Sequence, residues 1–293
     1  MLAFHSFWSE PNISRHGGII DFNDADLLVM ILSALKWKQL NGPILMISDS
    51  PGAEYFYSCE LEDLWTEPII TELDVLQNNV DSFLFWAAGK LKALSLVDVP
   101  CVMLDTDMII WSNLNESLRE NIVCAHFENI DNGAYPEPSV FQMKDGYQFD
   151  CSWDFTLQAA NTAFLYIPKR QFRDYYVESA FHFINSLDKS QVDPIVSMCF
   201  AEQRLLPMCA KASGIKVEPL LDMNNLDDQC IATHIWGYKS QIAASSTEME
   251  KLCMDCVGRI IVDFPEWEDR LLKNKRLQKY VLRYQSDKTK ITH

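Results

Sequence analysis

Along the first 50 residues, short apolar runs enclose one longer segment in which apolar and polar positions follow a helical period. The runs at residues 1–8 and 44–49 predict buried β-strands. Residues 24–40 carry apolar side chains at helical spacing, and Asn23 or Asp24 is the expected N-cap. A strand, a helix and a second strand in this order are typical of an α/β fold.

The same alternation continues along the chain. Asp81 is the expected cap of a helix at residues 82–97. Further strands are expected at residues 101–110, 121–127, 161–168 and 215–221. Further helices are expected at residues 113–120, 171–188, 193–213 (broken by Pro207) and 247–285 (interrupted at 263–267). Residues 128–153 predict a long loop, and loops of this length inside a compact domain are usually functional or mobile.

These elements predict one large domain followed by helices. We expect a mixed central sheet flanked by helices at residues 1–245, and a helical C-terminal appendage with a basic tail at residues 246–293. The 293 residues are ample for a single hydrophobic core.

Charge is distributed unevenly over this organisation. The net charge of −16 argues against a nucleic-acid partner. Residues 270–293, in contrast, contain eight lysines and arginines and one acid, Asp287. Leucines and tyrosines lie between these cations at helical spacing. The tail is therefore expected either to contact an anionic membrane surface as an amphipathic helix or to pack against the acidic remainder of the protein.

Cysteine usage favours a cytoplasmic protein with reduced thiols, with peripheral contact at the inner face of the membrane left open by the basic tail. The nine cysteines have no framework spacing, and the first residues show no signal-peptide pattern. Apolar runs are far shorter than the about 20 residues of a membrane span. Cys253 and Cys256 form a C-x-x-C without a second pair or a histidine nearby, so we expect ordinary buried thiols on a helix face.

Two carboxylates interrupt the apolar segment at residues 99–111. Asp105 and Asp107 would point to the same side of an extended strand, and at its carboxyl end they would reach the crevice where α/β sheets bind ligands. The two charges repel each other, and a hard divalent cation with phosphate oxygens as further ligands relieves that repulsion. The alternative is a strand that has reached solvent, with both aspartates capping the following turn.

The wider context of these aspartates favours the metal site. The block FWAAGKLKALSLVDVPCVMLDTDMIIWSNLNESL at residues 85–118 resembles glycosyltransferases of the GT-A fold. The similarity is greatest to the family 8 groups related to glycogenin and bacterial galactosyltransferases, and to capsular sugar transferases. Later segments resemble the same enzymes in the same order: NTAFLYIP (161–168), AEQRLL (201–206) and THIWGYKS (233–240). The resemblance covers about residues 1–245.

The resemblance implies a Rossmann-like GT-A fold and a role for each matching position. Mn²⁺ or Mg²⁺ would be held by Asp105, Asp107 and His234. The nucleotide-sugar donor, most simply a UDP-sugar, would be bound by Lys90, Asp105, Asn161, Lys239 and the backbone of Phe4, His5 and Ser6. The transferred sugar would contact Glu202 and Gln203. An inverting enzyme would need a carboxylate base, for which Asp154 is the candidate.

Each of these residues also has a structural interpretation. His234 would be a core histidine, Glu202 and Gln203 a solvated helix face, Asn161 a strand-end cap, and Lys90 a lysine whose stem lies along apolar surface.

The sequence thus predicts a metal-dependent transferase that moves a sugar to a glycan or lipid-linked acceptor with retention of configuration. One alternative is a phosphatase of the haloacid-dehalogenase type, with Asp105 as nucleophile, Asp107 as general acid and residues 225–229 as a late acidic pair. The other is an inactive GT-A domain that binds a glycan or a protein partner.

Overall fold

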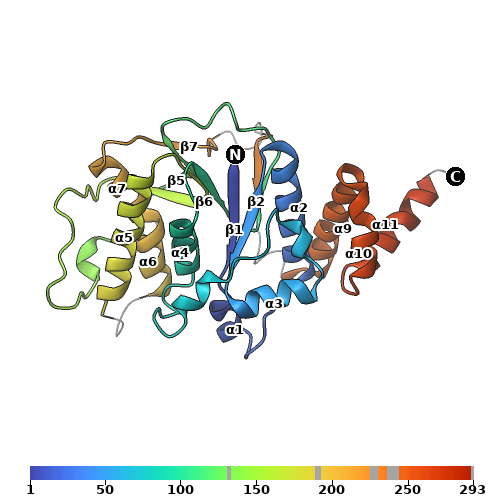
Figure 1. Ribbon diagram of the computed structural model, residues 1–293, viewed down its shortest axis with the longest axis horizontal. Helices are drawn as coiled ribbons and strands as arrows, with labels where there is room; N and C mark the ends of the chain where they lie inside the picture. The colour runs from blue at the N-terminus through green and yellow to red at the C-terminus, as the bar shows by residue number, and fades with distance from the viewer. Residues whose placement is uncertain (131–132, 189–192, 225–229, 236–243, 292–293) are drawn as a thin grey trace.

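The computed structural model describes residues 1–130, 133–188, 193–224, 230–235 and 244–291. A central sheet lies between two layers of helices, and the C-terminal helices extend the molecule on one side (Figure 1). The predicted fold class, a mixed α/β sheet flanked by helices with a helical C-terminus, is confirmed. Within the described residues, no helix is long and apolar enough to cross a membrane.

The central sheet has six strands in the order β2-β1-β3-β6-β5-β7. All neighbouring pairs are parallel except the two pairs that β6 forms with β3 and β5. The strands are β1 (Leu2–Phe7), β2 (Ile44–Ser48), β3 (Cys101–Leu104), β5 (Ile122–Glu128), β6 (Ala159–Ile167) and β7 (Val217–Pro219).

Both faces of this sheet are buried, which explains the nearly continuous apolar runs of its strands. Alternate strand residues belong to different cores: Ala3 packs with helix α2 (Asp24–Leu40), whereas Phe4 packs with the helices of the opposite face. That face is covered by α4 (Ala88–Leu96) and α5 (Arg170–Ser186). As predicted, Asn23 caps α2, because its side chain accepts a hydrogen bond from the N–H of Asp26.

The expected strand at residues 101–110 is two strands. β3 ends at Leu104, the chain turns at residues 105–107, and β4 (Met108–Ile110) then pairs antiparallel with β8 (Ala232–His234) in a separate two-stranded sheet. The two aspartates therefore lie in a turn between sheets and not on one face of an extended strand. The turn places His234 opposite Met108.

Two predicted helices differ from the structure. The helix expected at residues 82–97 begins at Ala88, and Asp81 instead accepts hydrogen bonds from the N–H groups of Phe83 and Leu84 in a preceding turn. Residues 113–120 form turns and no helix. There the side chain of Asn41 accepts a hydrogen bond from the N–H of Leu114, and this contact fixes the segment to the end of α2.

The helix expected at residues 193–213 is interrupted before Pro207, not at it. It consists of α6 (Pro194–Cys199), a π-turn (Phe200–Arg204) and α7 (Leu205–Ala212). A proline lacks its N–H and clashes with the carbonyl four residues earlier, which here belongs to Gln203 in the π-turn. The wider turn accommodates the proline and directs residues 202–203 differently from a regular helix.

The remaining elements complete the two helical layers. They are α1 (Glu10–Arg15), α3 (Ser50–Ser58) and the 3₁₀ turns Glu62–Leu64, Glu72–Leu76 and Pro138–Val140. The loop predicted at residues 128–153 contains the last of these turns and packs its aromatic side chains inward. Phe141 and Phe149 contact Phe200, with ring centroids 4.8 Å and 5.8 Å apart.

The C-terminal appendage packs on the acidic body of the protein. It comprises α9 (Ser246–Asp263), a 3₁₀ turn (Pro265–Trp267), α10 (Glu268–Lys273) and α11 (Gln278–Ile291). Basic residues of the tail bind acids outside it: Arg270 binds Asp63 at 2.6 Å, and Lys279 binds Asp24 at 2.7 Å. Cys253 and Cys256 are buried on α9, as expected of structural thiols.

Gly89 provides a test of the packing between α4 and the N-terminal segment. A Cβ at this position would lie 2.6 Å from Cβ of Trp8, which is closer than real side chains approach. Alanine favours helices over glycine by about 1 kcal/mol, yet we expect Gly89→Ala to destabilise the protein by about 1–3 kcal/mol through overpacking. Thermal unfolding measures the change, with Leu96→Ala on the exposed side of the same helix as the control. A melting temperature that Gly89→Ala leaves unchanged or raises would contradict this account.

Candidate functional site

The turn between β3 and β4 places two carboxylates at the carboxyl end of the central sheet. The N–H of Asp105 donates to the carbonyl of Ala163 on β6 at 2.7 Å, and the N–H of Met108 donates to the carbonyl of Asp105 at 3.1 Å. The first bond ties the turn to the central sheet and the second closes it. Asp105 and Asp107 therefore have fixed backbone positions, although the chain is leaving one sheet for another.

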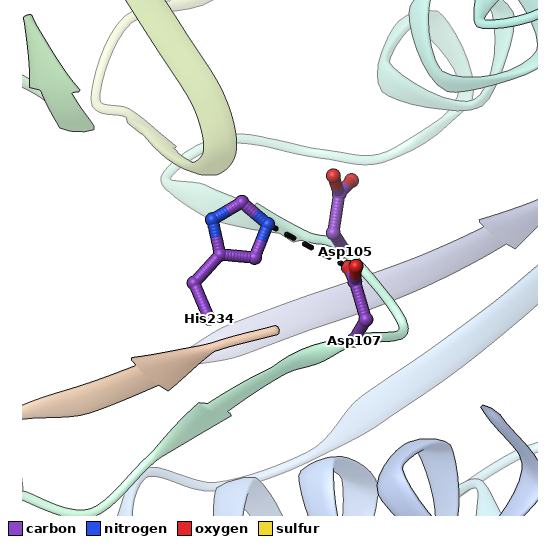
Figure 2. A group of neighbouring side chains, drawn as sticks. All are labelled: Asp105, Asp107 and His234. Carbon is purple, nitrogen blue, oxygen red and sulfur yellow. Dashed lines mark ion pairs between the residues drawn. The ribbon is translucent and has the colours of Figure 1, made fainter. Parts of the chain in front are cut away.

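His234 joins the two aspartates from β8. One ligand atom from each of Asp105, Asp107 and His234 lies within 4.8 Å of the others, and His234 Nε2 is 3.7 Å from Asp107 Oδ1 (Figure 2). Burial lowers the pKa of His234, against the opposing effect of the two aspartates. The imidazole is therefore neutral near pH 7, which is the form that binds metals.

The chemistry of these donors fits a divalent cation. Carboxylate oxygens suit Mg²⁺ and Mn²⁺, and an added imidazole extends the range toward Mn²⁺. Two neighbouring carboxylates in a partly buried site also repel each other, and a cation removes that cost. The structural interpretation of His234 as a plain core histidine does not account for its contact with Asp107 and its place beside Asp105.

A buried chain of hydrogen bonds fixes the strand that follows the turn. Trp65 Nε1 donates to His5 Nδ1 at 3.4 Å, His5 Nε2 lies 3.1 Å from Ser33 Oγ, and Ser33 Oγ donates to the carbonyl of Met108 at 2.5 Å. Burial lowers the pKa of His5 to about 3, so the ring is neutral and carries its proton on Nε2 in this chain. The side chain of His5 thus anchors β4.

Lys90 of α4 provides the cation nearest to these acids. Its Nζ lies 2.8 Å from Asp105 Oδ1 and 2.5 Å from Glu202 Oε1. Burial alone would lower the pKa of Lys90, but the two carboxylates outweigh it and raise the pKa above the usual value. Glu202 also accepts a hydrogen bond from Thr162 Oγ1 at 2.5 Å, so its carboxylate is fixed in place.

A cavity of about 420 Å³ opens beside this cluster. Six of the predicted site residues line it: Lys90, Asp105, Asn161, Glu202, Gln203 and His234. The remaining lining residues are Trp86, Glu128, Ala134, Tyr135, Thr162, Ala163, Ile195, Met198 and Cys199. The cavity thus combines acids, amides and one lysine with an apolar wall, which is the usual composition of a small-molecule site.

The two predicted amide residues are held by partners in the cavity wall. Asn161 Nδ2 donates to Glu128 Oε1 at 3.3 Å, and Asn161 Oδ1 accepts from the N–H of Ala163. Gln203 Oε1 accepts a hydrogen bond from the hydroxyl of Tyr135. Asn161 thus makes a local side-chain bond of the capping kind and also holds Glu128 on β5, whereas Gln203 contacts Tyr135 and is not on a freely solvated helix face.

Other predicted residues lie elsewhere. Asp154 does not line the cavity; its carboxylate binds Lys211 Nζ at 2.5 Å, and this bond lowers its pKa and makes it a weaker base. Phe4, His5 and Ser6 are also absent from the cavity lining, and the side chains of Phe4 and His5 are buried in the sheet. Lys239, the other predicted diphosphate ligand, lies outside the described residues.

Sequence reasoning missed several cavity residues. Glu128 is the last residue of β5, and Asp105 directly follows β3, so the place of an acid at a strand end was a usable signal. Thr162 lies inside the segment already singled out at residues 161–168, but its bond to Glu202 depends on the π-turn. Tyr135 belongs to the long loop, where no periodicity indicates which side chain turns inward.

The fold and the three donors define an α/β protein with a candidate metal site at the carboxyl end of its central sheet. The chain matches the Family of unknown function (DUF6734) over residues 1–273 and belongs to that family. No curated protein matches it by sequence. Among solved structures it is similar to the apo form of mouse xyloside xylosyltransferase 1, with 13% identity, a TM-score of 0.37, and coverage of 74% of this chain and 84% of that chain. A likeness this low carries no conclusion about activity.

The metal site can be tested by titration. Asp105→Asn and His234→Ala each remove one donor, and we expect either change to lower Mn²⁺ affinity at least about tenfold, since losing even an outer partner of a metal ligand has that effect. Calorimetry measures the affinity. Asp154→Asn is the control, because its carboxylate binds Lys211 outside the cavity, and it should bind Mn²⁺ like the unaltered protein. The same affinity in all four proteins would argue against the site.

Proposed function

We propose that the protein is a metal-dependent glycosyltransferase that takes a sugar from a nucleoside-diphosphate sugar, in the first instance a UDP-sugar. The observation that carries the proposal is the group Asp105, Asp107 and His234 beside a cavity into which Lys90 also faces. Its place after β3, the order of the matching segments along the chain and the α/β fold support the resemblance to GT-A enzymes.

A divalent cation bound by the three donors would neutralise charge on the departing diphosphate. Asp105 and Asp107 supply the negative charge that holds it, and neutral His234 completes the set. Lys90 presents a second positive charge to the phosphate oxygens, at a position fixed by its bonds to Asp105 and Glu202. Lys239 is proposed to present a further positive charge to the same phosphate oxygens.

The amide and acid side of the cavity is proposed to hold the transferred sugar. Gln203 and Glu202 offer polar atoms whose positions are fixed by Tyr135, Thr162 and Lys90. Fixed hydrogen-bonding groups orient a sugar hydroxyl at little entropic cost. Retention is part of the proposal through the resemblance to retaining enzymes; Asp154, the carboxylate expected to serve an inverting reaction, does not line the cavity, although Glu128 does.

The acceptor is proposed to be a glycan or a lipid-linked glycan. The cavity is lined by three residues of the segment predicted as a long loop, Glu128, Ala134 and Tyr135. Loops vary more freely than the sheet that supports them, so we propose that this side of the cavity faces the acceptor. Contact of α11 with a membrane surface remains a proposal. One cation of α11, Lys279, binds Asp24 of the body, and another, Arg283, binds Glu250 on α9.

The proposal predicts that nucleotide binding needs the metal. Titration calorimetry with UDP and GDP should show binding with Mn²⁺ or Mg²⁺ and none with a chelator, and Asp105→Asn should abolish the metal-dependent part. Nucleotide binding that does not depend on the metal, or no nucleotide binding at all, would contradict the transferase proposal. Release of phosphate from an aryl phosphate, lost in Asp105→Asn, would instead support the phosphatase alternative.

If Lys90 binds the phosphates and not the metal, substituting it should weaken nucleotide binding and leave metal binding intact. Lys90→Met should weaken UDP binding in the presence of Mn²⁺ at least about tenfold, because one charge-assisted hydrogen bond is lost. Affinity for Mn²⁺ alone should not fall, because a cation near the metal has been removed. Lys92→Met, two residues along the same helix and lining a different cavity, is the matched control. Weakened Mn²⁺ binding in Lys90→Met would show that the lysine supports the metal site instead.

A further inference from the structure

Trp111 connects the strand after the metal-site turn to the strand that carries His234. Its backbone N–H donates to the carbonyl of Ile231 at 2.8 Å, and its indole Nε1 donates to Thr233 Oγ1 at 2.8 Å. Thr233 pairs with Ile109 in the ladder between β4 and β8 and directly precedes His234. The indole therefore holds the neighbour of a candidate metal ligand.

Two cations from different helices lie against the ring of Trp111. Lys36 Nζ on α2 is 5.8 Å from the ring centroid, and Arg259 Cζ on α9 is 5.4 Å from it. Both cations bind Oδ2 of Asp263, the last residue of α9, at 2.5 Å and 2.6 Å. We call Trp111, Lys36, Arg259 and Asp263 the tryptophan cluster.

The tryptophan cluster contains two cations that share one acid; Lys36 and Asp263 are shielded from solvent, whereas the side chain of Arg259 is half exposed. The side chains of Lys36 and Asp263 are 7% and 15% exposed. Lys36 Nζ also lies 5.3 Å from the ring of Phe264 and donates to Gln39 Oε1 at 2.9 Å. Cations are attracted to the face of an aromatic ring, so Lys36 and Arg259 stabilise the observed position of the indole.

The strand β8 needs such support more than the strands of the central sheet do. It has three residues, and within the described part of the chain it pairs with β4 alone. Besides the ladder, the N–H of Ile235 donates to the carbonyl of Asp107 at 3.2 Å. The bond from Trp111 to Thr233 adds a side-chain contact that aligns β8 along its length.

We propose that Thr233, Trp111 and Arg259 are positioning residues for His234, so that helix α9 of the appendage supports the metal site. The inference rests on the metal site of the proposed function. The inference gives the C-terminal helices a role in positioning a candidate metal ligand, and this role does not depend on contact with a membrane. It also extends the functional unit past residue 245, in keeping with a family match that includes α9.

The hydroxyl of Thr233 is tested by a pair of substitutions. Thr233→Val keeps the branched shape and removes the acceptor for the indole N–H, and we expect Mn²⁺ affinity to fall about tenfold while the melting temperature changes little. Thr233→Ser retains the hydroxyl and should restore the affinity. Calorimetry and thermal unfolding on the full chain give the two readouts.

The link to α9 is tested by two matched arginines of the appendage. Arg259 lies over Trp111 and binds Asp263 at 2.6 Å; Arg270 lies over Trp267, at 5.1 Å, and binds Asp63 at 2.6 Å. Arg259→Met should lower Mn²⁺ affinity, and Arg270→Met should leave it unchanged at a similar cost in stability. The effect of Arg259→Met should also shrink in a Thr233→Val background, because both act through the indole.

The outcomes separate this inference from the proposed function. If the unaltered protein binds Mn²⁺ and Thr233→Val and Arg259→Met bind it equally well, the inference is overturned and the metal site stands. Equal losses of affinity in Arg259→Met and Arg270→Met, tracking the melting temperature, would also overturn it by showing a general stability effect. An unaltered protein that binds no Mn²⁺ removes the metal site and the inference together.

Discussion

The two ion pairs of the Lys90 ammonium group connect the elements that surround the cavity. This group lies between Asp105, at the end of β3, and Glu202, in the π-turn, and so joins a strand and two helices at one point. Without it, two carboxylates would face each other in a partly buried space, which is costly. The two ion pairs bring these carboxylates together at the edge of the cavity.

The sequence predicted the central elements because their apolar runs and caps are local signals. The strands at residues 1–8 and 44–49 and the helix after Asn23 are observed with small shifts of their ends. The break of the strand at residues 101–110 was not foreseeable in this way, since β4 pairs with a strand more than 120 residues away. The π-turn was likewise hidden, because Pro207 marks an irregularity but not its position.

The candidate site was predictable to the extent that its residues follow strands or belong to a short motif. Asp105, Asp107, Asn161, Glu202 and His234 were predicted in this way, and the structure brings Asp105, Asp107 and His234 together. Asp154 lies outside the cavity, because the direction of a side chain after a long loop is set by tertiary contacts such as its bond to Lys211. Tyr135 and Glu128 also line the cavity, and neither was predicted from the sequence.

The reversed direction of β6 determines which part of the chain can reshape the cavity. Strand β6 runs opposite to its neighbours. Its first half, at Asn161 to Ala163, therefore lies beside the end of β3. The first half of β6, and not its last residues, therefore contributes to the cavity wall. Insertions or deletions in the loop at residues 128–153 would alter what the cavity admits and leave the turn at residues 105–107 untouched. If the proposed function holds, the selectivity of the cavity and the binding of the cation can thus change independently in evolution.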